Sequence, residues 1–166
     1  MRMTDEILRE FEQEAPVTRR VLERVPLNHG DWKPHPKSTP LGTLASWMAN
    51  APGWTAGVLP GDGIDVAEWE AYATPSSTAE LLAAFDRGCA AARSALQKLD
   101  DAAARGDWSF RMGGKTLNTL PRIGLARLFL LSDAIHHRGQ MSVYLRLLDV
   151  PVPAIYGPSA DENPHA

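Results

Sequence analysis

Two adjacent histidines, His136 and His137, stand within the segment LSDAIHHRGQMSVYLRLLDV at residues 131–150. The segment is typical of an amphipathic helix, in which successive side chains point about 100° apart, so the two imidazoles cannot face one site. Asp133 and His137 are four residues apart and share a face beside the apolar stripe, and Gln140 follows one turn later. An aspartate and a histidine so placed can ligate a metal together, or the carboxylate can hydrogen-bond the imidazole and fix its tautomer.

The Asp133–His137 pattern by itself leaves two interpretations open. The pair belongs either to a metal or ligand site, or to a histidine that is satisfied in the core or at a subunit interface. Arg138 and Arg146 in the same helix could bind an anionic ligand, but we expect them to pair with carboxylates of a neighbouring helix or subunit. The lone cysteine, Cys89, falls in an alanine-rich run and is expected to be a small buried apolar side chain rather than a reactive thiol.

The composition describes one ordinary globular domain spanning residues 1–166, with 44% apolar and 22% charged residues. The net charge of −3 and the lack of a basic block argue against a nucleic-acid partner. The strongest apolar run, IGLARLFLL, is too short to span a bilayer and contains an arginine, so we expect no membrane contact. A single cysteine cannot form an internal disulfide, and the N-terminal segment does not resemble a secretion signal. We therefore expect a protein of the cytoplasm.

The spacing of apolar residues predicts four helices that would position these side chains. The first spans about residues 4–24, with a kink or break at Pro16, because proline lacks the N–H that a helix interior needs. The second begins sharply, with Thr39 as the N-cap and Pro40 as the first helical residue. Residues 60–75 carry Gly, Asp and Pro signals and are expected to be irregular.

The third predicted helix, residues 77–104, opens with the capping-box pattern SSTAELL. A glycine pair, Gly113 and Gly114, is flanked by alternating residues and predicts a β-hairpin. Residues 121–148 form the fourth helix, and the proline-rich tail after it is expected to lie as a strap against the bundle through residues such as Tyr156. The sum is an all-α four-helix bundle with a small β-hairpin between the third and fourth helices and an extended C-terminal strap, and such bundles build sites between facing helices.

Several segments resemble one known family. The segments IHHRGQMSVYLR and VPVPAIYGPSADE resemble the C-terminal signature of the DinB-like (damage-inducible) protein family, and the likeness extends back through DWKPHPKSTPLGTLA, PGW and WSFRMGGKTLNTLPRIG. The resemblance implies a four-helix bundle of up-down-down-up topology that is usually dimeric. It also implies kinship with thiol-dependent S-transferases and isomerases, which hold a divalent metal with one histidine from the second helix and an HxxxH pair from the fourth.

Only part of that ligand set matches this chain. The second histidine of the HxxxH pair matches His137, the first falls on Asp133, and the histidine of the second helix falls on Trp47, whose indole cannot ligate a cation. Two protein ligands are too few for a tight zinc site, which uses three or four. A loop histidine, His29 or His35, could supply the missing ligand, or Trp47 could fill the metal cavity or form a stacking wall for a ligand.

These observations lead to two functional hypotheses from different classes. In the first, a pocket between the second and fourth helices, bordered by Trp47, Asp133, His137 and Gln140, serves a thiol S-transferase with a degenerate site for Zn, Ni or Mn and a low-molecular-weight thiol. In the second, a small-molecule-binding or stress-associated protein has kept the fold and lost the metal. A homodimer is expected in both cases, and a purely structural dimer is a third possibility.

Overall fold

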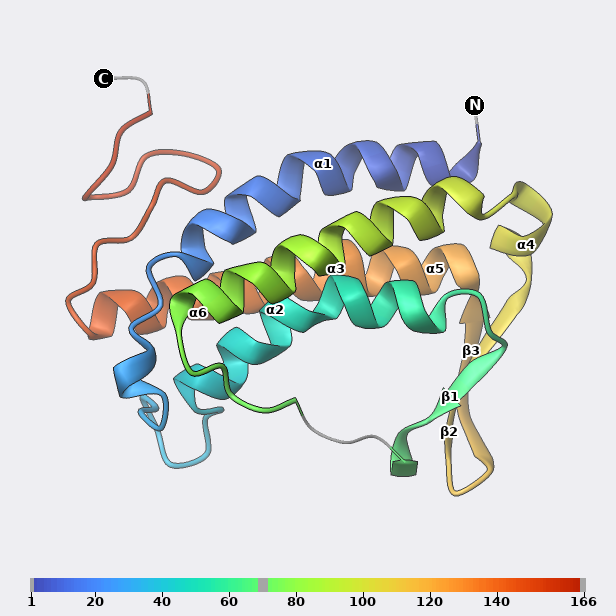
Figure 1. The fold of residues 1–166 in the computed structure, drawn as a ribbon, viewed down its shortest axis with the longest axis horizontal. Coiled ribbons are helices and arrows are strands. Elements are labelled where there is room, and N and C mark those ends of the chain that lie inside the picture. Colours follow the sequence, from blue (N-terminus) through green and yellow to red (C-terminus); the bar gives the residue numbers. More distant parts are fainter. Residues whose placement is uncertain (1, 69–71, 165–166) are drawn as a thin grey trace.

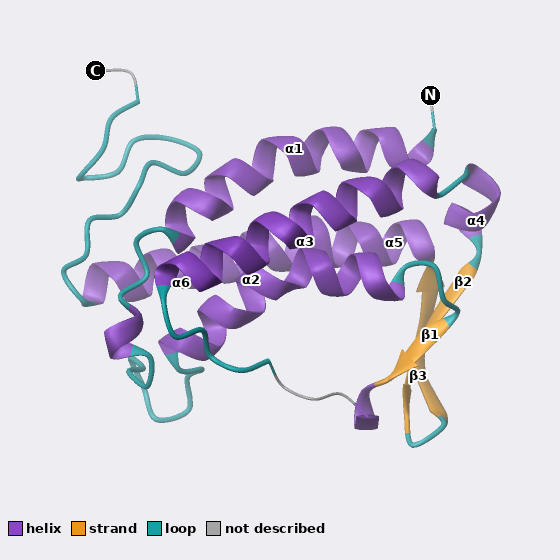
Figure 2. Cartoon of the chain, viewed as in Figure 1, coloured by secondary structure: helices purple, strands orange, loops and turns teal. Residues whose placement is uncertain are grey.

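The computed structural model describes residues 2–68 and 72–164 of a mostly helical chain that carries a small sheet. Four long helices lie side by side (Figure 1). Figure 2 shows the sheet beyond one end of them. The long helices are α1 (Met3–Leu22), α2 (Leu41–Val58), α3 (Thr78–Lys98) and α6 (Asp133–Leu147). Both α2 and α1 pack against α3 and α6, so each helix buries an apolar stripe against its neighbours.

One apolar core unites all four long helices. Its members recur at helical spacing along each helix, which is why the periodicity of the sequence predicts these elements. The core includes Ile7, Phe11, Val21, Leu44, Met48, Leu81, Phe85, Leu96, Met141 and Leu145.

Helix α1 is continuous through Pro16, so the break predicted there does not occur. A proline inside a helix costs about 3 kcal/mol or more because it removes a hydrogen bond and crowds the preceding turn. Phe11 and Val21, on either side of the proline, are both buried in the core. Their burial holds the helix together across the proline, which is a tertiary effect that the local sequence does not reveal.

The start of α2 differs from the predicted cap. Pro40 is the N-cap and Leu41 the first helical residue, with no side chain capping the helix. The Thr39 carbonyl accepts a hydrogen bond of 3.0 Å from the Tyr144 hydroxyl instead. The prediction of Thr39 as a cap is therefore wrong, and the residue fixes the entry to α2 by bonding α6.

The predicted helix of residues 77–104 is two helices. Ser77 caps α3 as expected, accepting a 3.2 Å hydrogen bond from the Glu80 N–H, although the Glu80 carboxylate accepts from Ser76. Helix α3 ends at Lys98, and α4 (Asp101–Arg105) begins with a new cap, Asp100, which accepts from the Ala103 N–H at 2.8 Å. An aspartate at this place competes with helix continuation, because its side chain bonds the backbone locally.

The expected hairpin is present and belongs to a larger sheet. Strands β2 (Asp107–Met112) and β3 (Lys115–Pro121) pair antiparallel across Gly113 and Gly114, whose φ values of 57° and 78° suit the tight turn. Strand β1 (Gly63–Asp65) adds a parallel partner to β2. The fold is mostly helical, as expected, but its sheet has one strand more than the predicted hairpin. Irregular structure was expected over residues 60–75 and is found at residues 60–62 and 72–75, whereas residues 63–68 form β1 and a short helical turn; residues 69–71 lie outside the described ranges.

Asp65 ties β1 to the hairpin turn. Its carboxylate accepts from the backbone N–H groups of Gly114 at 2.6 Å and Gly113 at 2.9 Å. The hydrogen bond from Gly114, with another from Ala67, lowers the pKa of Asp65. A short 3-10 turn, η2 (Val66–Glu68), follows the strand.

The fourth predicted helix is helical along its length but changes its winding. Helix α5 (Arg122–Arg127) leads into the π-helical segment η3 (Leu128–Ser132), which continues as α6. Pro121 closes β3 and is the N-cap of α5 rather than its first residue. Short π segments occur often at functional sites, and this one ends directly before Asp133.

The C-terminal strap lies against the helices, as expected. Arg20 on α1 pairs with Glu162 at 2.5 Å, and Arg146 on α6 pairs with Asp161 at 2.5 Å. These contacts anchor the tail to two helices. Within the described part of the chain, none of the helices is both long and apolar enough to cross a membrane.

Candidate functional site

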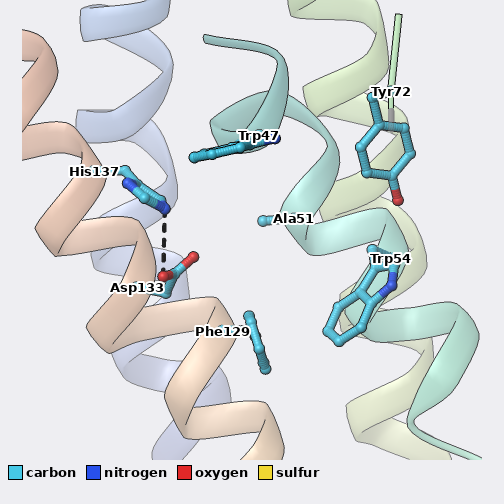
Figure 3. Close-up of a pocket in the computed structure, with 7 residues that line it drawn as sticks. All are labelled: Trp47, Ala51, Trp54, Tyr72, Phe129, Asp133 and His137. Atoms are coloured by element: carbon cyan, nitrogen blue, oxygen red, sulfur yellow. Dashed lines mark ion pairs between the residues drawn. The ribbon is translucent and has the colours of Figure 1, made fainter. Parts of the chain in front are cut away.

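A cavity of about 200 Å³ lies between α2 and α6, and Figure 3 shows the side chains that border it. Of the described lining residues, those of α6 are an aspartate and a histidine, whereas α2 and η3 supply mainly aromatic rings. The lining residues are Trp47, Ala51, Trp54, Tyr72, Phe129, Asp133 and His137. A mostly apolar cavity with a few convergent polar groups is the usual form of a small-molecule site.

Asp133 and His137 form the polar edge of the cavity. Their separation of four residues stacks them on one face of α6, and His137 Nε2 lies 3.4 Å from Asp133 Oδ1. Both side chains are largely withdrawn from solvent, with exposed fractions of 16% for His137 and 31% for Asp133. His136 is exposed, so the structure places the two adjacent histidines on different faces.

Gln140 acts on the site from outside the cavity. Its Oε1 lies 2.9 Å from His137 Nδ1, and its side chain is not part of the lining. An amide oxygen can only accept, so Nδ1 carries a proton in this contact. In the neutral ring, Nε2 then carries a lone pair that points toward Asp133 and the cavity. In the doubly protonated ring, Nε2 carries a second N–H that faces the carboxylate. Gln140 therefore orients the imidazole, and the Asp133 side of the ring faces the ligand space.

The opposite wall is a cluster of aromatic rings. Trp54 meets Phe129 edge-on with ring centroids 4.7 Å apart, and Phe129 also contacts Phe110 of β2 at 5.9 Å. Trp108 of β2 packs against Trp54 at 6.5 Å and donates its indole N–H to the Val58 carbonyl at 3.0 Å. Strand β2 of the sheet thus packs behind the rings that line the cavity.

Trp47 stands across from His137 on α2. The ring centroids are 5.7 Å apart with an interplanar angle of 48°, and the indole is 39% exposed. It therefore forms a rim of the cavity rather than filling it. Ala51, one turn further along α2, leaves the space behind this rim open.

The residues present do not fit the three-histidine metal site that the resemblance implies. Among residues 2–68 and 72–164, no three His, Cys, Asp or Glu side chains come together as a metal-binding group. Neither His29 nor His35 lines the cavity, and His35 Nδ1 is engaged by the Lys37 N–H at 3.1 Å. One nitrogen and one carboxylate remain, which is fewer donors than a tight zinc site requires.

The remaining reactive or charged candidates lie away from the cavity. Burial raises the pKa of the Cys89 thiol to about 12, so Cys89 is the inert buried side chain that was expected. Arg138 points into the bundle, where it bonds Glu14 at 2.5 Å, and Arg146 bonds Asp161. The prediction of a carboxylate on a neighbouring helix is confirmed for Arg138, whereas the partner of Arg146 lies in the C-terminal strap of the same chain.

Four lining residues were not anticipated as part of the site: Ala51, Trp54, Tyr72 and Phe129. Three of them carry a signal in their spacing. Ala51 and Trp54 follow Trp47 by four and seven positions, and Phe129 precedes Asp133 by four, so each repeats the helical face of an anticipated residue. Tyr72 lies outside the helices and has no such signal.

Comparison with known proteins places this arrangement in a family. The family model described as the DinB family matches residues 1–164. The chain belongs to the DinB family. No curated protein matches.

Two solved structures share the DinB fold with this chain. A DinB-like protein from Bacillus cereus superposes with a TM-score of 0.70 at 20% identity, covering 92% of this chain and 97% of that one. A DinB-like protein from Bacillus subtilis gives a TM-score of 0.66 at 18% identity, covering 87% and 92%. At such low identity the likeness concerns the fold of this DinB-family protein.

Proposed function

We propose that this DinB-family protein binds a small molecule in the cavity between α2 and α6 and does so without a resident metal. The apolar part of the ligand stacks against Trp47, Trp54 and Phe129, and a hydroxyl, thiol or amine bonds to the Asp133–His137 pair. The observation that carries this proposal is a wall of packed aromatic rings facing one oriented Asp–His pair.

The character of the lining supports binding of an apolar ligand with one polar end. Rings supply most of the wall, and their faces stack with flat or aliphatic groups. Asp133 is the one carboxylate among the described residues that line the cavity, and it accepts hydrogen bonds and repels anions. A ligand therefore gains most by turning a hydrogen-bond donor toward Asp133 and His137.

Thiol transfer without a metal is the second candidate function. His137 is oriented by Gln140 on one nitrogen and directs the other toward Asp133 and the cavity. An imidazole so held can take the proton of a bound low-molecular-weight thiol, and Asp133 would stabilise the resulting imidazolium. The divalent metal that the resemblance implies, with Zn, Ni or Mn as the candidates, would find two protein donors here, so metal binding stays a prediction for direct measurement.

The test of the binding proposal uses 4-propylphenol, which has an apolar body and one hydroxyl. Calorimetry should detect saturable binding to the wild type. His137→Ala should weaken it about fivefold, since a hydrogen bond is worth about 1 kcal/mol. His136→Ala, on the exposed face, is the matched control and should leave the affinity unchanged. Equal effects of the two substitutions, or no saturable binding by the wild type, would contradict the proposal.

The same variants separate the two candidate functions. With L-cysteine and the electrophile 1-chloro-2,4-dinitrobenzene as co-substrates, a thiol transferase forms the S-conjugate faster than buffer does. A rate enhancement that His137→Ala abolishes and His136→Ala preserves supports transfer. Binding of 4-propylphenol with no rate enhancement supports the binding function alone.

The finer fold and assembly expectations belong to this proposal too. We infer the up-down-down-up topology, supported by Figure 1, in which α2 and α3 run in one direction and α1 and α6 in the other.

A homodimer stays a prediction. It is supported by the outward face of α6, where Val143 and Leu147 are each 56% exposed beside Gly139. Residence in the cytoplasm also stays a prediction.

A further inference from the structure

A second hollow adjoins the cavity on the side away from α6. It is a groove of about 360 Å³ over the place where α2 and α3 pack, and Trp54 and Tyr72 line both the groove and the cavity. Its floor is made of small residues. Gly53 and Gly88 bring the two helix backbones so close that a Cβ on Gly88 would lie 2.8 Å from the Gly53 nitrogen. The groove therefore follows from the close helix packing.

Among the residues that the structure describes, Arg87 of α3 is the one charged residue that lines this groove. Across the described ranges 2–68 and 72–164, its guanidinium makes no hydrogen bond or ion pair. The nearby acids of α3 direct their hydrogen bonds to other groups, although the pKa of Glu80 is lowered by the Ser76 hydrogen bonds and, in addition, by the positive charge of Arg87. Asp86 pairs with Arg19 at 2.9 Å, and the Glu80 carboxylate accepts from the Ser76 N–H and hydroxyl, each at 2.8 Å. Five N–H donors of Arg87 thus remain available beside an apolar floor.

The size of the cavity gives a reason for a ligand to reach the groove. Pockets for ordinary small molecules occupy roughly 300–1,000 Å³, whereas the cavity at Asp133 and His137 holds about 200 Å³. A ligand of usual size must extend beyond it. Trp54 and Tyr72 lie across the cavity from Asp133 and His137 (Figure 3), and they are the wall shared with the groove.

We propose that Arg87 is the anion subsite of this cavity and that the ligand is an amphipathic carboxylate. The inference rests on the proposed function and names its ligand class. The carboxylate pairs with Arg87, the apolar body crosses the Trp54–Tyr72 wall into the cavity, and a donor group meets Asp133 and His137. The charges determine the orientation of the ligand, because the Asp133 carboxylate repels its anionic end whereas Arg87 attracts it.

Two probes of equal length test the subsite: 4-(4-hydroxyphenyl)butyrate and its neutral analogue 4-(4-hydroxyphenyl)butan-1-ol. By calorimetry the acid should bind the wild type about fivefold more tightly than the alcohol, as expected for a partly exposed charge pair. Arg87→Gln should remove that difference without changing the affinity for the alcohol. Arg87→Lys should keep part of it. The preference for the acid should also shrink as NaCl is raised, because salt screens exposed charges.

Arg24→Gln is the matched control, since Arg24 is another exposed arginine and does not line either hollow. It should leave both affinities unchanged. The subsite proposal is wrong if the alcohol binds and the acid binds no more tightly, or if Arg87→Gln and Arg24→Gln have equal effects. In either case the proposal that the cavity binds a small molecule is unaffected. If neither probe binds the wild type, the proposed function fails and the subsite fails with it.

Discussion

The indole of Trp47 faces the imidazole of His137 across the cavity, with ring centroids 5.7 Å apart. The family resemblance places a metal-binding histidine at the position of Trp47, so a ring that cannot ligate stands where a third donor is implied. The other two positions keep one nitrogen, from His137, and one carboxylate, from Asp133. At the position where the resemblance implies a ligand, this chain therefore presents an indole on the rim of an aromatic cavity.

Restoring the third ligand should restore metal binding. Untagged protein is incubated with Zn²⁺, Ni²⁺ and Mn²⁺, desalted, and analysed by elemental mass spectrometry. We expect the wild type to retain well below one metal per chain, because two protein ligands do not make a tight site. Trp47→His adds an imidazole opposite His137 and should raise the zinc content toward one per chain.

Two controls make this result specific. Trp47→Phe removes the indole without adding a ligand and should leave the metal content low. His137→Ala in the Trp47→His background should abolish the gain. Near-stoichiometric metal in the wild type that is lost in His137→Ala would overturn the metal-free proposal and mean that Asp133 and a further ligand form a complete site.

Much of the fold could be predicted because helices carry their own signals. Apolar residues at helical spacing predicted the four long helices, and the pair Gly113 and Gly114 predicted the hairpin turn. Strand β1 could not be predicted, since its three residues, Gly63–Asp65, are defined by pairing with β2 and not by a local pattern. The continuity of α1 through Pro16 likewise depends on packing by distant helices.

The candidate site likewise has a part that the sequence predicts and a part that depends on packing. The spacing of Asp133, His137 and Gln140 placed them together because they share one helix. Which groups meet across helices is a property of the three-dimensional arrangement. The aromatic wall that joins Phe129 to Trp54, and the wall shared with the groove of Arg87, depend on how the helices and β2 are packed.

Stability should fall at high pH through Cys89. Burial raises the pKa of its thiol from 9.0 to about 12 in the folded protein. The unfolded chain loses this proton first, so it binds fewer protons than the folded chain and the free energy of unfolding decreases as pH rises from about 9 to 12. The slope due to one group is at most about 1.4 kcal/mol per pH unit.

Urea titrations of the wild type and Cys89→Ala at pH 7 to 11 isolate this contribution, because other groups titrate equally in both proteins. The free-energy difference should be constant up to about pH 8 and then shift in favour of Cys89→Ala. Parallel curves over the whole range would show that the thiol has no raised pKa in the folded protein.

Removing Arg138 should destabilise the protein strongly. Its side chain is 1% exposed and bonds Glu14 Oε2 at 2.5 Å, Thr18 Oγ1 at 3.2 Å and the Tyr156 hydroxyl. Arg138→Ala leaves the Glu14 carboxylate, 14% exposed, without its cation. Breaking a buried pair from one side costs about 3–5 kcal/mol, because an uncompensated charge remains inside. Urea unfolding measures the loss.

Arg146→Ala is the control, since Arg146 pairs with Asp161 at the surface, where solvent weakens ion pairs. Arg146→Ala should lower the free energy of unfolding far less than Arg138→Ala. The double variant Arg138→Met, Glu14→Gln removes both charges and keeps much of the volume, so it should recover a large part of the stability that Arg138→Ala loses. A cost for Arg138→Ala no greater than that for Arg146→Ala would mean that water reaches Glu14. The contact between α1, α6 and the strap residue Tyr156 would then not depend on this ion pair.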